Sequence, residues 1–214
     1  MHSVASRRTA NKHHNSRPPL VPSTATQSAI VFSWNDFLCP IEIFHAAHAM
    51  PSQAQLAQLD QSIVQLLLHA QTIAPVFVLC ESGAAFMETL CMSLFPRCAQ
   101  LFASPEMQRR IQLVCAATSL TPQWHGQMLH MITTLRLPMT MRPGMSCALV
   151  VFGKETMRAG CLALAKFAPT CIQPKVLTNA VTSVDVVATM QRLAAVGQSL
   201  HTIVSHAGAI DIVV

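Results

Sequence analysis

The chain has 214 residues, of which 51% are hydrophobic and 11% are charged, and its formal net charge is +5 at pH 7. This length and apolar content suffice for one domain with a single buried core. The charge is modest and no basic face carries interleaved aromatic residues, so the sequence gives no support for nucleic-acid binding. No stretch reaches the roughly 18 consecutive apolar residues of a membrane-spanning helix, so we expect a soluble protein.

Eight cysteines are spread singly along the chain, several of them within apolar runs, and none forms a Cys-x-x-Cys pair. A structural zinc site therefore has no support. We expect most of the thiols to be small buried side chains in a reducing compartment.

The N-terminal residues 1–28 contain Ser, Thr, Pro, Arg and His but neither Asp nor Glu. This composition is typical of a disordered tail or of a mitochondrial transit peptide. Pro18, Pro19 and Pro22 interrupt the amphipathic helix that a transit peptide needs. We therefore expect a tail on a cytoplasmic protein, with a mitochondrial location as the alternative.

The first predicted strand runs from Ala29 to Phe32 and is followed by a polar cluster of Ser33, Asn35 and Asp36. This is the pattern of a buried parallel strand that ends at the edge of a sheet. Ligands bind at that edge in open α/β folds, so any chemistry is expected there.

A possible metal-binding face follows at Glu42, His45 and His48, which would lie on one side of a helix. Such a trio can suit a metal ion, but it is more often a solvated surface. We therefore expect a solvated helix surface here rather than a metal site.

Strand and helix patterns alternate along the rest of the chain. Further strands are predicted at 75–80, 111–116, 147–155 and 176–177, and helices at 52–72 with Ser52 as the N-cap, from 122 onward, and at 184–200. About five strands alternating with helices predict an α/β fold with a doubly wound, mostly parallel sheet and no large cap domain, over residues 29–214.

The segment Ser33-Trp34-Asn35-Asp36-Phe37-Leu38-Cys39-Pro40 resembles the first motif of the haloacid dehalogenase-like (HAD-like) superfamily. It is most similar to a protist branch that reads Asp-Trp-Asp-Asp-Thr-Leu-x-Pro, which Trp34, Asp36, Leu38 and Pro40 match. Three later segments resemble further motifs of that branch. Residues 86–97 resemble its Trp-Val-Glu-Leu-Ser and Leu-Pro-Arg motifs. Residues 122–125 resemble its Pro-x-x-Trp-Lys motif, and residues 205–212 resemble its His-Asp-Gly-x-Leu-Asp-Leu ending. Both tryptophans, Trp34 and Trp124, coincide with tryptophans of the family pattern.

The resemblance also implies that the family's catalytic positions have changed. The nucleophilic and proton-donating aspartates, the phosphoryl-binding hydroxyl, the lysine and the magnesium-holding aspartate fall at Ser33, Asn35, Cys80, His125 and Lys154, respectively. An amide cannot exchange a proton at neutral pH, a serine is a poor nucleophile without a base, and an ammonium group repels magnesium. We therefore expect no catalytic residues, no magnesium site and no cofactor.

These substitutions predict a catalytically inactive HAD-like pseudoenzyme that acts as a binding or structural module for an unidentified protein partner. Two alternatives stay open. Cys80 and His125 could form a nucleophile pair in an altered phosphatase or hydrolase of HAD descent. Lys154 and His125 could instead form a cationic pocket that senses a small anion, unless Lys154 pairs with Asp36 or Glu155.

Overall fold

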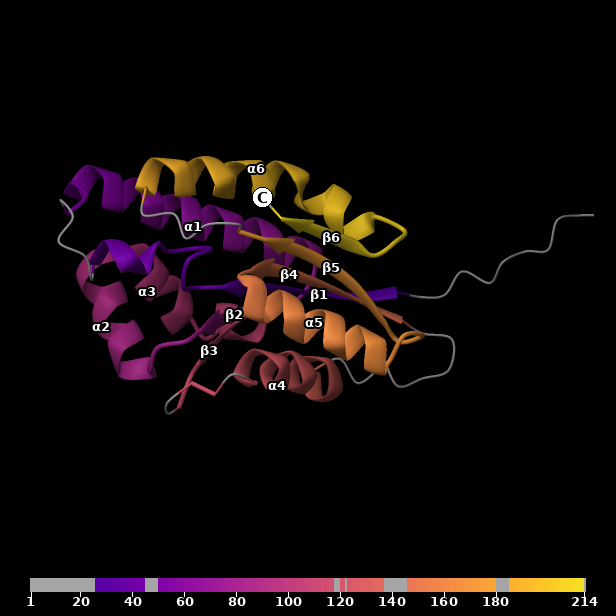
Figure 1. Cartoon of the computed structure of the whole chain (residues 1–214). Helices are drawn as coiled ribbons and strands as arrows, with labels where there is room; N and C mark the ends of the chain where they lie inside the picture. The colour runs from indigo at the N-terminus through magenta and orange to yellow at the C-terminus, as the bar shows by residue number, and fades with distance from the viewer. Residues whose placement is uncertain are drawn as a thin grey trace, which may run out of the picture.

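The computed structural model describes residues 26–44, 50–117, 120–121, 123–136, 146–179 and 185–213. Within them, six strands form one parallel sheet in the order β3-β2-β1-β4-β5-β6, with helices on both faces (Figure 1). The strands are β1 (Thr26–Ser33), β2 (Val76–Cys80), β3 (Ile111–Cys115), β4 (Ser146–Gly153), β5 (Ile172–Thr178) and β6 (Ile210–Val213). The predicted doubly wound α/β class is confirmed.

The helices are α1 (Gln53–Ile73), α2 (Ala84–Leu94), α3 (Pro96–Ala103), α4 (Trp124–Met131), α5 (Glu155–Phe167) and α6 (Val186–Ser205). Short 3₁₀ turns occupy η1 (Ile41–Phe44) and η2 (Met107–Arg109), and a π-helical turn, η3 (Ile132–Arg136), continues α4. None of these described helices is long and apolar enough to cross a membrane.

The structure adds two details to the predicted sheet. The closing segment adds a sixth strand, β6, which pairs with β5. Strand β5 begins at Ile172, so Pro174 lies inside it rather than before it. Pro174 pairs with Leu149 of β4, whereas the pairing of β5 with β6 begins only at Lys175. At Pro174 the side of β5 that faces β6 is therefore still an edge, where a proline without an N–H is tolerated.

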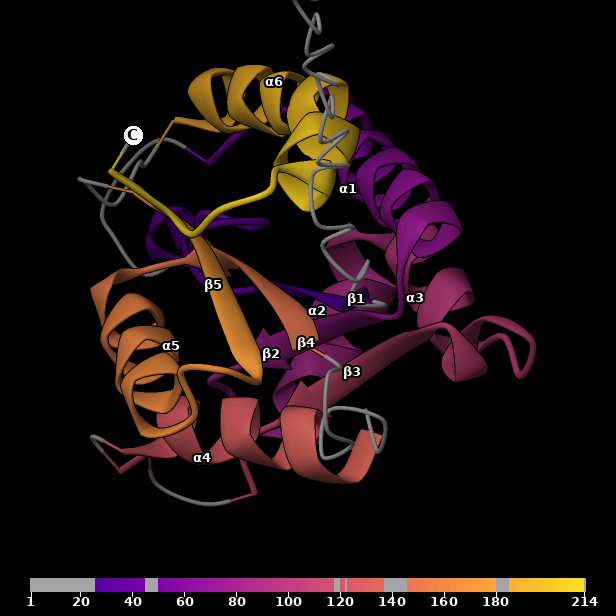
Figure 2. The same ribbon diagram turned by 90° about the vertical axis from the view of Figure 1, so that its right-hand side faces the viewer.

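Two separate cores lie on the two faces of the sheet, because successive side chains of each strand point to opposite sides. In β1, Ile30 and Phe32 pack with α1, α2, α3 and α6. Ala29 and Val31 pack with α4 and α5. Figure 2 shows α1 and α6 side by side over one face and α4 and α5 over the other.

Helix α1 forms as the sequence predicts. Its N-cap is Ser52, whose hydroxyl accepts from the Gln55 N–H while the Gln55 side chain accepts from the Ser52 N–H. Leu56, Leu59 and Ile63 recur on one face and are buried.

Two buried charges hold helix ends. The Asp60 carboxylate, from α1, accepts from the N–H groups of Arg97 and Cys98 at 2.8 and 3.0 Å, in the first turn of α3. The Lys175 ammonium, from β5, donates to the carbonyls of Val204 and His206 at the end of α6. Each charge has the sign that complements the helix dipole at its end.

Candidate site at the strand ends

The candidate site lies where the strand order reverses. From β1 the chain proceeds outward to β2 and β3 on one side, and then to β4, β5 and β6 on the other. Open α/β sheets bind ligands at the carboxyl ends of strands beside such a switch point. Ser33, Glu81 and Lys154 stand at or directly after the ends of β1, β2 and β4.

The loop after β1 is held together by its own polar groups. The Ser33 hydroxyl is buried and donates to the carbonyl of Asn35 at 2.7 Å. The Asn35 side-chain oxygen accepts from the N–H of Glu81 at 3.0 Å, which ties the loop after β1 to the end of β2. Asp36 has a φ of 70°, a left-handed conformation that an aspartate tolerates better than most residues. Ser33 and Asn35 therefore maintain the loop.

Residues that are distant in sequence support the same loop. The Asn179 side chain donates to the carbonyl of Asp36 at 2.8 Å, from just beyond β5. Arg192 of α6 donates to the carbonyl of Phe37 at 2.9 Å, and its guanidinium carbon lies 5.3 Å from the centre of the Phe37 ring. These contacts fix the Asp36 backbone and leave its carboxylate directed toward Lys154.

Gly153 permits the close approach of β4 to this loop. A Cβ at position 153 would lie 2.5 Å from the Met157 sulfur and 3.2 Å from the Ser33 Cβ. A side chain at position 153 would therefore displace the end of Met157 and press against Ser33.

The centre of the site is an ion-pair cluster. The Lys154 ammonium lies 2.6 Å from Glu81 Oε2 and 3.9 Å from Asp36 Oδ2. Lys154 also lies 2.5 Å from Glu81 Oε1, and His125 Nε2 lies 3.2 Å from this same oxygen. The Lys154 side chain is 31% exposed and that of Glu81 14%, so the cluster is largely covered but reaches solvent along Lys154.

The two carboxylates respond differently to this environment. Burial alone would raise the pKa of Glu81, but His125 and Lys154 together outweigh it, so the pKa lies below its usual value. Burial raises the pKa of Asp36, and the more distant Lys154 only partly offsets this. Glu81 is therefore the principal partner of Lys154.

His125, the first-turn residue of α4, is buried at 4% exposure and stacks edge-on against Trp124. Its Nε2 is near Glu81 but not aligned for a hydrogen bond, and no other described residue supplies one. The interaction with Glu81 is thus electrostatic and becomes a true ion pair only when the imidazole is protonated.

Cys80 does not join this cluster. It packs with Val76 and Val78 on the face covered by α1, α2, α3 and α6, whereas His125 belongs to α4 on the opposite face. Within the described residues no hydrogen bond joins Cys80 to His125; Cys80 instead lies beside its register partner Cys115 on β3. The sheet itself separates the two side chains, so the alternative of a Cys80–His125 nucleophile pair has no support in this arrangement.

The structure therefore brings Ser33, Asn35, His125 and Lys154 to one strand-end site and excludes Cys80 from it. Lys154 is near Asp36, as one alternative predicts, while Glu155 pairs with Arg158. Sequence reasoning missed Glu81, although it follows a buried strand just as Ser33 does. The strand-end rule applied to β2 without regard to the resemblance would have identified it.

Among the described residues, no group of three or more His, Cys, Asp or Glu side chains is arranged to hold a metal ion. Glu42 is exposed on η1, and His45 and His48 lie outside the described residues. No protein-family model matches the chain, and no curated protein matches it either.

Proposed function

We propose that this chain is a catalytically inactive HAD-like domain that serves as a binding or structural module. The observation that carries the proposal is the position of Lys154. Its ammonium group lies between the carboxylates of Glu81 and Asp36, at the strand-end site where a hydrolase of this resemblance would need a divalent cation. A covalently tethered cation therefore supplies the charge that magnesium would supply.

The remaining side chains support inactivity. The Ser33 hydroxyl is buried and already donates to the Asn35 carbonyl, so no base is placed to activate it. Asn35 uses its oxygen to bind the Glu81 N–H and offers no exchangeable proton at neutral pH. Both positions are thus occupied by groups that hold the loop after β1 in place.

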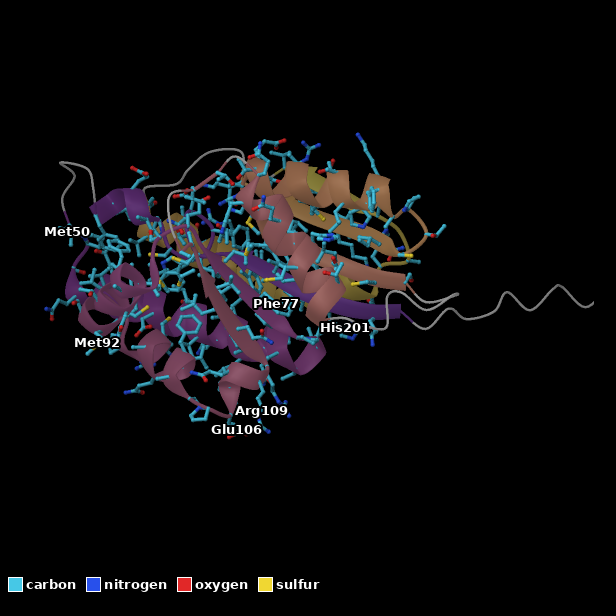
Figure 3. All side chains as sticks on the ribbon, turned by 90° about the horizontal axis from the view of Figure 1, so that it is seen from below. Met50, Phe77, Met92, Glu106, Arg109 and His201 are labelled. Carbon is cyan, nitrogen blue, oxygen red and sulfur yellow. The ribbon has the colours of Figure 1, made fainter. Side chains whose placement is uncertain are left out.

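The cluster also argues against the two alternatives. A Cys80–His125 hydrolase lacks its pair, as described above. An anion-binding pocket would require uncompensated positive charge, whereas Lys154 and His125 both face Glu81, and Asp36 adds a further carboxylate. We place the candidate partner surface at α2, where Phe86 and Met92 are 41% and 68% exposed; Figure 3 shows Met92 at the periphery of the molecule.

Hydrolysis of an aryl phosphate by the purified full chain tests the proposal. With magnesium present, we expect the wild-type protein to turn over no faster than Ser33→Ala or Cys80→Ala variants, which control for contaminating phosphatases. Magnesium-dependent turnover that either substitution abolishes would overturn the proposal.

Thermal unfolding tests the role of the tethered cation directly. Lys154→Ala frees the two carboxylates, so magnesium should raise the melting temperature of this variant but not that of the wild type. Lys166→Ala, which removes an exposed ammonium group on α5, is the matched control. Equal stabilisation of all three proteins by magnesium would contradict the assignment of Lys154.

A further inference from the structure

Two thiols meet on the side of the sheet away from the ion-pair cluster. Cys80 and Cys115 are register partners on the parallel strands β2 and β3. Both pack against the core shared by α1, α2, α3 and α6, so their side chains point to the same face. Adjacent strands lie roughly 4.8 Å apart, which falls within the range of Cα separations of about 4.4 to 6.8 Å that a disulfide can span.

The two thiols differ in access. Cys80 is completely buried, whereas Cys115 is partly exposed. Cys115 lines a groove of about 360 Å³ between α2, α3 and β3, together with Cys91, Met87, Leu113 and Phe102. A small neutral molecule can therefore reach Cys115 through an apolar opening, while Cys80 lies behind it.

We propose that Cys115 is a site of reversible oxidation by hydrogen peroxide, with Cys80 as the resolving thiol that closes a disulfide between β2 and β3. The Cys115 thiolate attacks one peroxide oxygen and the O–O bond breaks. Cys115 becomes a sulfenic acid, and the departing hydroxide takes up a proton as water. The Cys80 sulfur then attacks the Cys115 sulfur, and a second water leaves. Two thiols lose two electrons and two protons, and one peroxide becomes two waters.

The electrostatics of the pair agree with this division of roles. A hydrogen bond from the Cys80 thiol lowers the pKa of Cys115 against the opposing effect of burial. The same hydrogen bond, together with burial, raises the pKa of Cys80. The thiolate form, which is the nucleophile, is therefore favoured on the accessible sulfur.

Cys91 is the competing partner, since it lines the same groove. Burial raises the pKa of Cys91 to about 12, and Cys91 is only 3% exposed. Cys80 is the register partner of Cys115 on the adjacent strand, whereas Cys91 belongs to α2. The proposal therefore specifies the 80–115 pairing.

The experiment treats the reduced full chain with hydrogen peroxide, blocks the remaining thiols by alkylation, and maps the peptides by mass spectrometry. We expect a Cys80–Cys115 disulfide that dithiothreitol reverses. In Cys80→Ala, Cys115 should stall as a sulfenic acid, detectable with dimedone, and proceed to sulfinic acid. In Cys115→Ser, Cys80 should stay reduced, because it is buried. Circular dichroism verifies that both variants are folded.

Cys171 supplies the internal control. It is also partly exposed, but its thiol lies 3.7 Å from the Thr170 hydroxyl. Cys115 should be oxidised several-fold faster than Cys171. Equal rates at the two sites, a Cys91–Cys115 product, or a Cys80→Ala variant in which Cys115 does not react would each overturn the proposal.

Discussion

The interior of the molecule and its strand-end site both contain charges, but the charges have different partners. Asp60 and Lys175 are 1% exposed and bind backbone groups at helix ends. In the strand-end cluster, the carboxylates of Glu81 and Asp36 both pair with Lys154, and the cluster reaches solvent. The partners of the interior charges are backbone groups, which no substitution removes. The partners of the cluster charges are side chains, so a pair of substitutions can remove both members of an ion pair together.

This difference predicts unequal costs of substitution. Loss of an interior charge leaves buried N–H or C=O groups without a partner, and each costs about 1 to 3 kcal/mol. Loss of a cluster charge leaves its partner in a site that reaches solvent along Lys154, so we expect a smaller cost of about 1 kcal/mol.

The largest effect is expected for Asp60→Ala, which leaves the N–H groups of Arg97 and Cys98 without acceptors at the start of α3. We expect the free energy of unfolding to fall by about 3 kcal/mol in urea denaturation. Asp60→Asn retains one acceptor and should lose less, and Glu88→Ala on the exposed face of α2 should change little. If Asp60→Ala cost no more than Glu88→Ala, the helix-end role of Asp60 would be wrong.

The next largest effect is expected for Lys175→Met. Its free energy of unfolding should fall by about 2 kcal/mol at neutral pH, because the carbonyls of Val204 and His206 lose a charged donor. Lys166→Met, at an exposed position, is the matched control. Comparable urea midpoints for the two variants would refute the role of Lys175 as the cap of α6.

The lowered pKa of Lys175 also predicts that the free energy of unfolding depends on pH in the alkaline range. Burial lowers its pKa below the usual 10.5, so the unfolded chain keeps this proton to higher pH than the native state does. Its contribution to unfolding free energy should therefore rise as the pH increases through the native pKa toward 10.5. A plot of wild-type minus Lys175→Met stability against pH measures this rise, and a flat or falling difference would contradict it.

Smaller effects are expected for Glu81→Gln and Lys154→Met, about 1 kcal/mol each, and the double variant should lose less than their sum. A double-mutant cycle in urea measures the coupling. Strict additivity would mean that the Glu81–Lys154 contact contributes nothing to stability.

The smallest effect is the acid dependence of the cluster. Because the native pKa of Glu81 lies below its usual 4.5, its contribution is present above pH 4.5 and is lost as the pH falls through the native value. The raised pKa of Asp36 has the opposite sign, and its proton uptake offsets part of the loss. Glu81→Gln should therefore flatten the acid limb of the stability curve, whereas an unchanged acid limb would exclude Glu81 as its cause.

Periodicity and cap signals predicted much of the fold because they depend on neighbours in the chain. The apolar spacing of Leu56, Leu59 and Ile63 and the cap at Ser52 placed α1 correctly. The apolar runs placed five strands, and the polar residues after β1 located the site. The short, mostly exposed β6 lacks an apolar run of that kind, and pairing with β5 alone makes it a strand.

By itself the sequence determined the α/β class, the helix and strand order and the strand-end location of Ser33, Asn35 and Lys154, since these follow from local pattern and from the geometry of parallel sheets. Only the tertiary structure decided which side chains are partners. Because successive residues of β2 point to opposite faces, Cys80 lies beside Cys115, whereas Glu81 contacts Lys154 and His125. The packing of α1 on α3 places Asp60 beside the N–H groups that it binds. Such contacts join residues far apart in the chain, and residue type fixes their chemistry but not their partners.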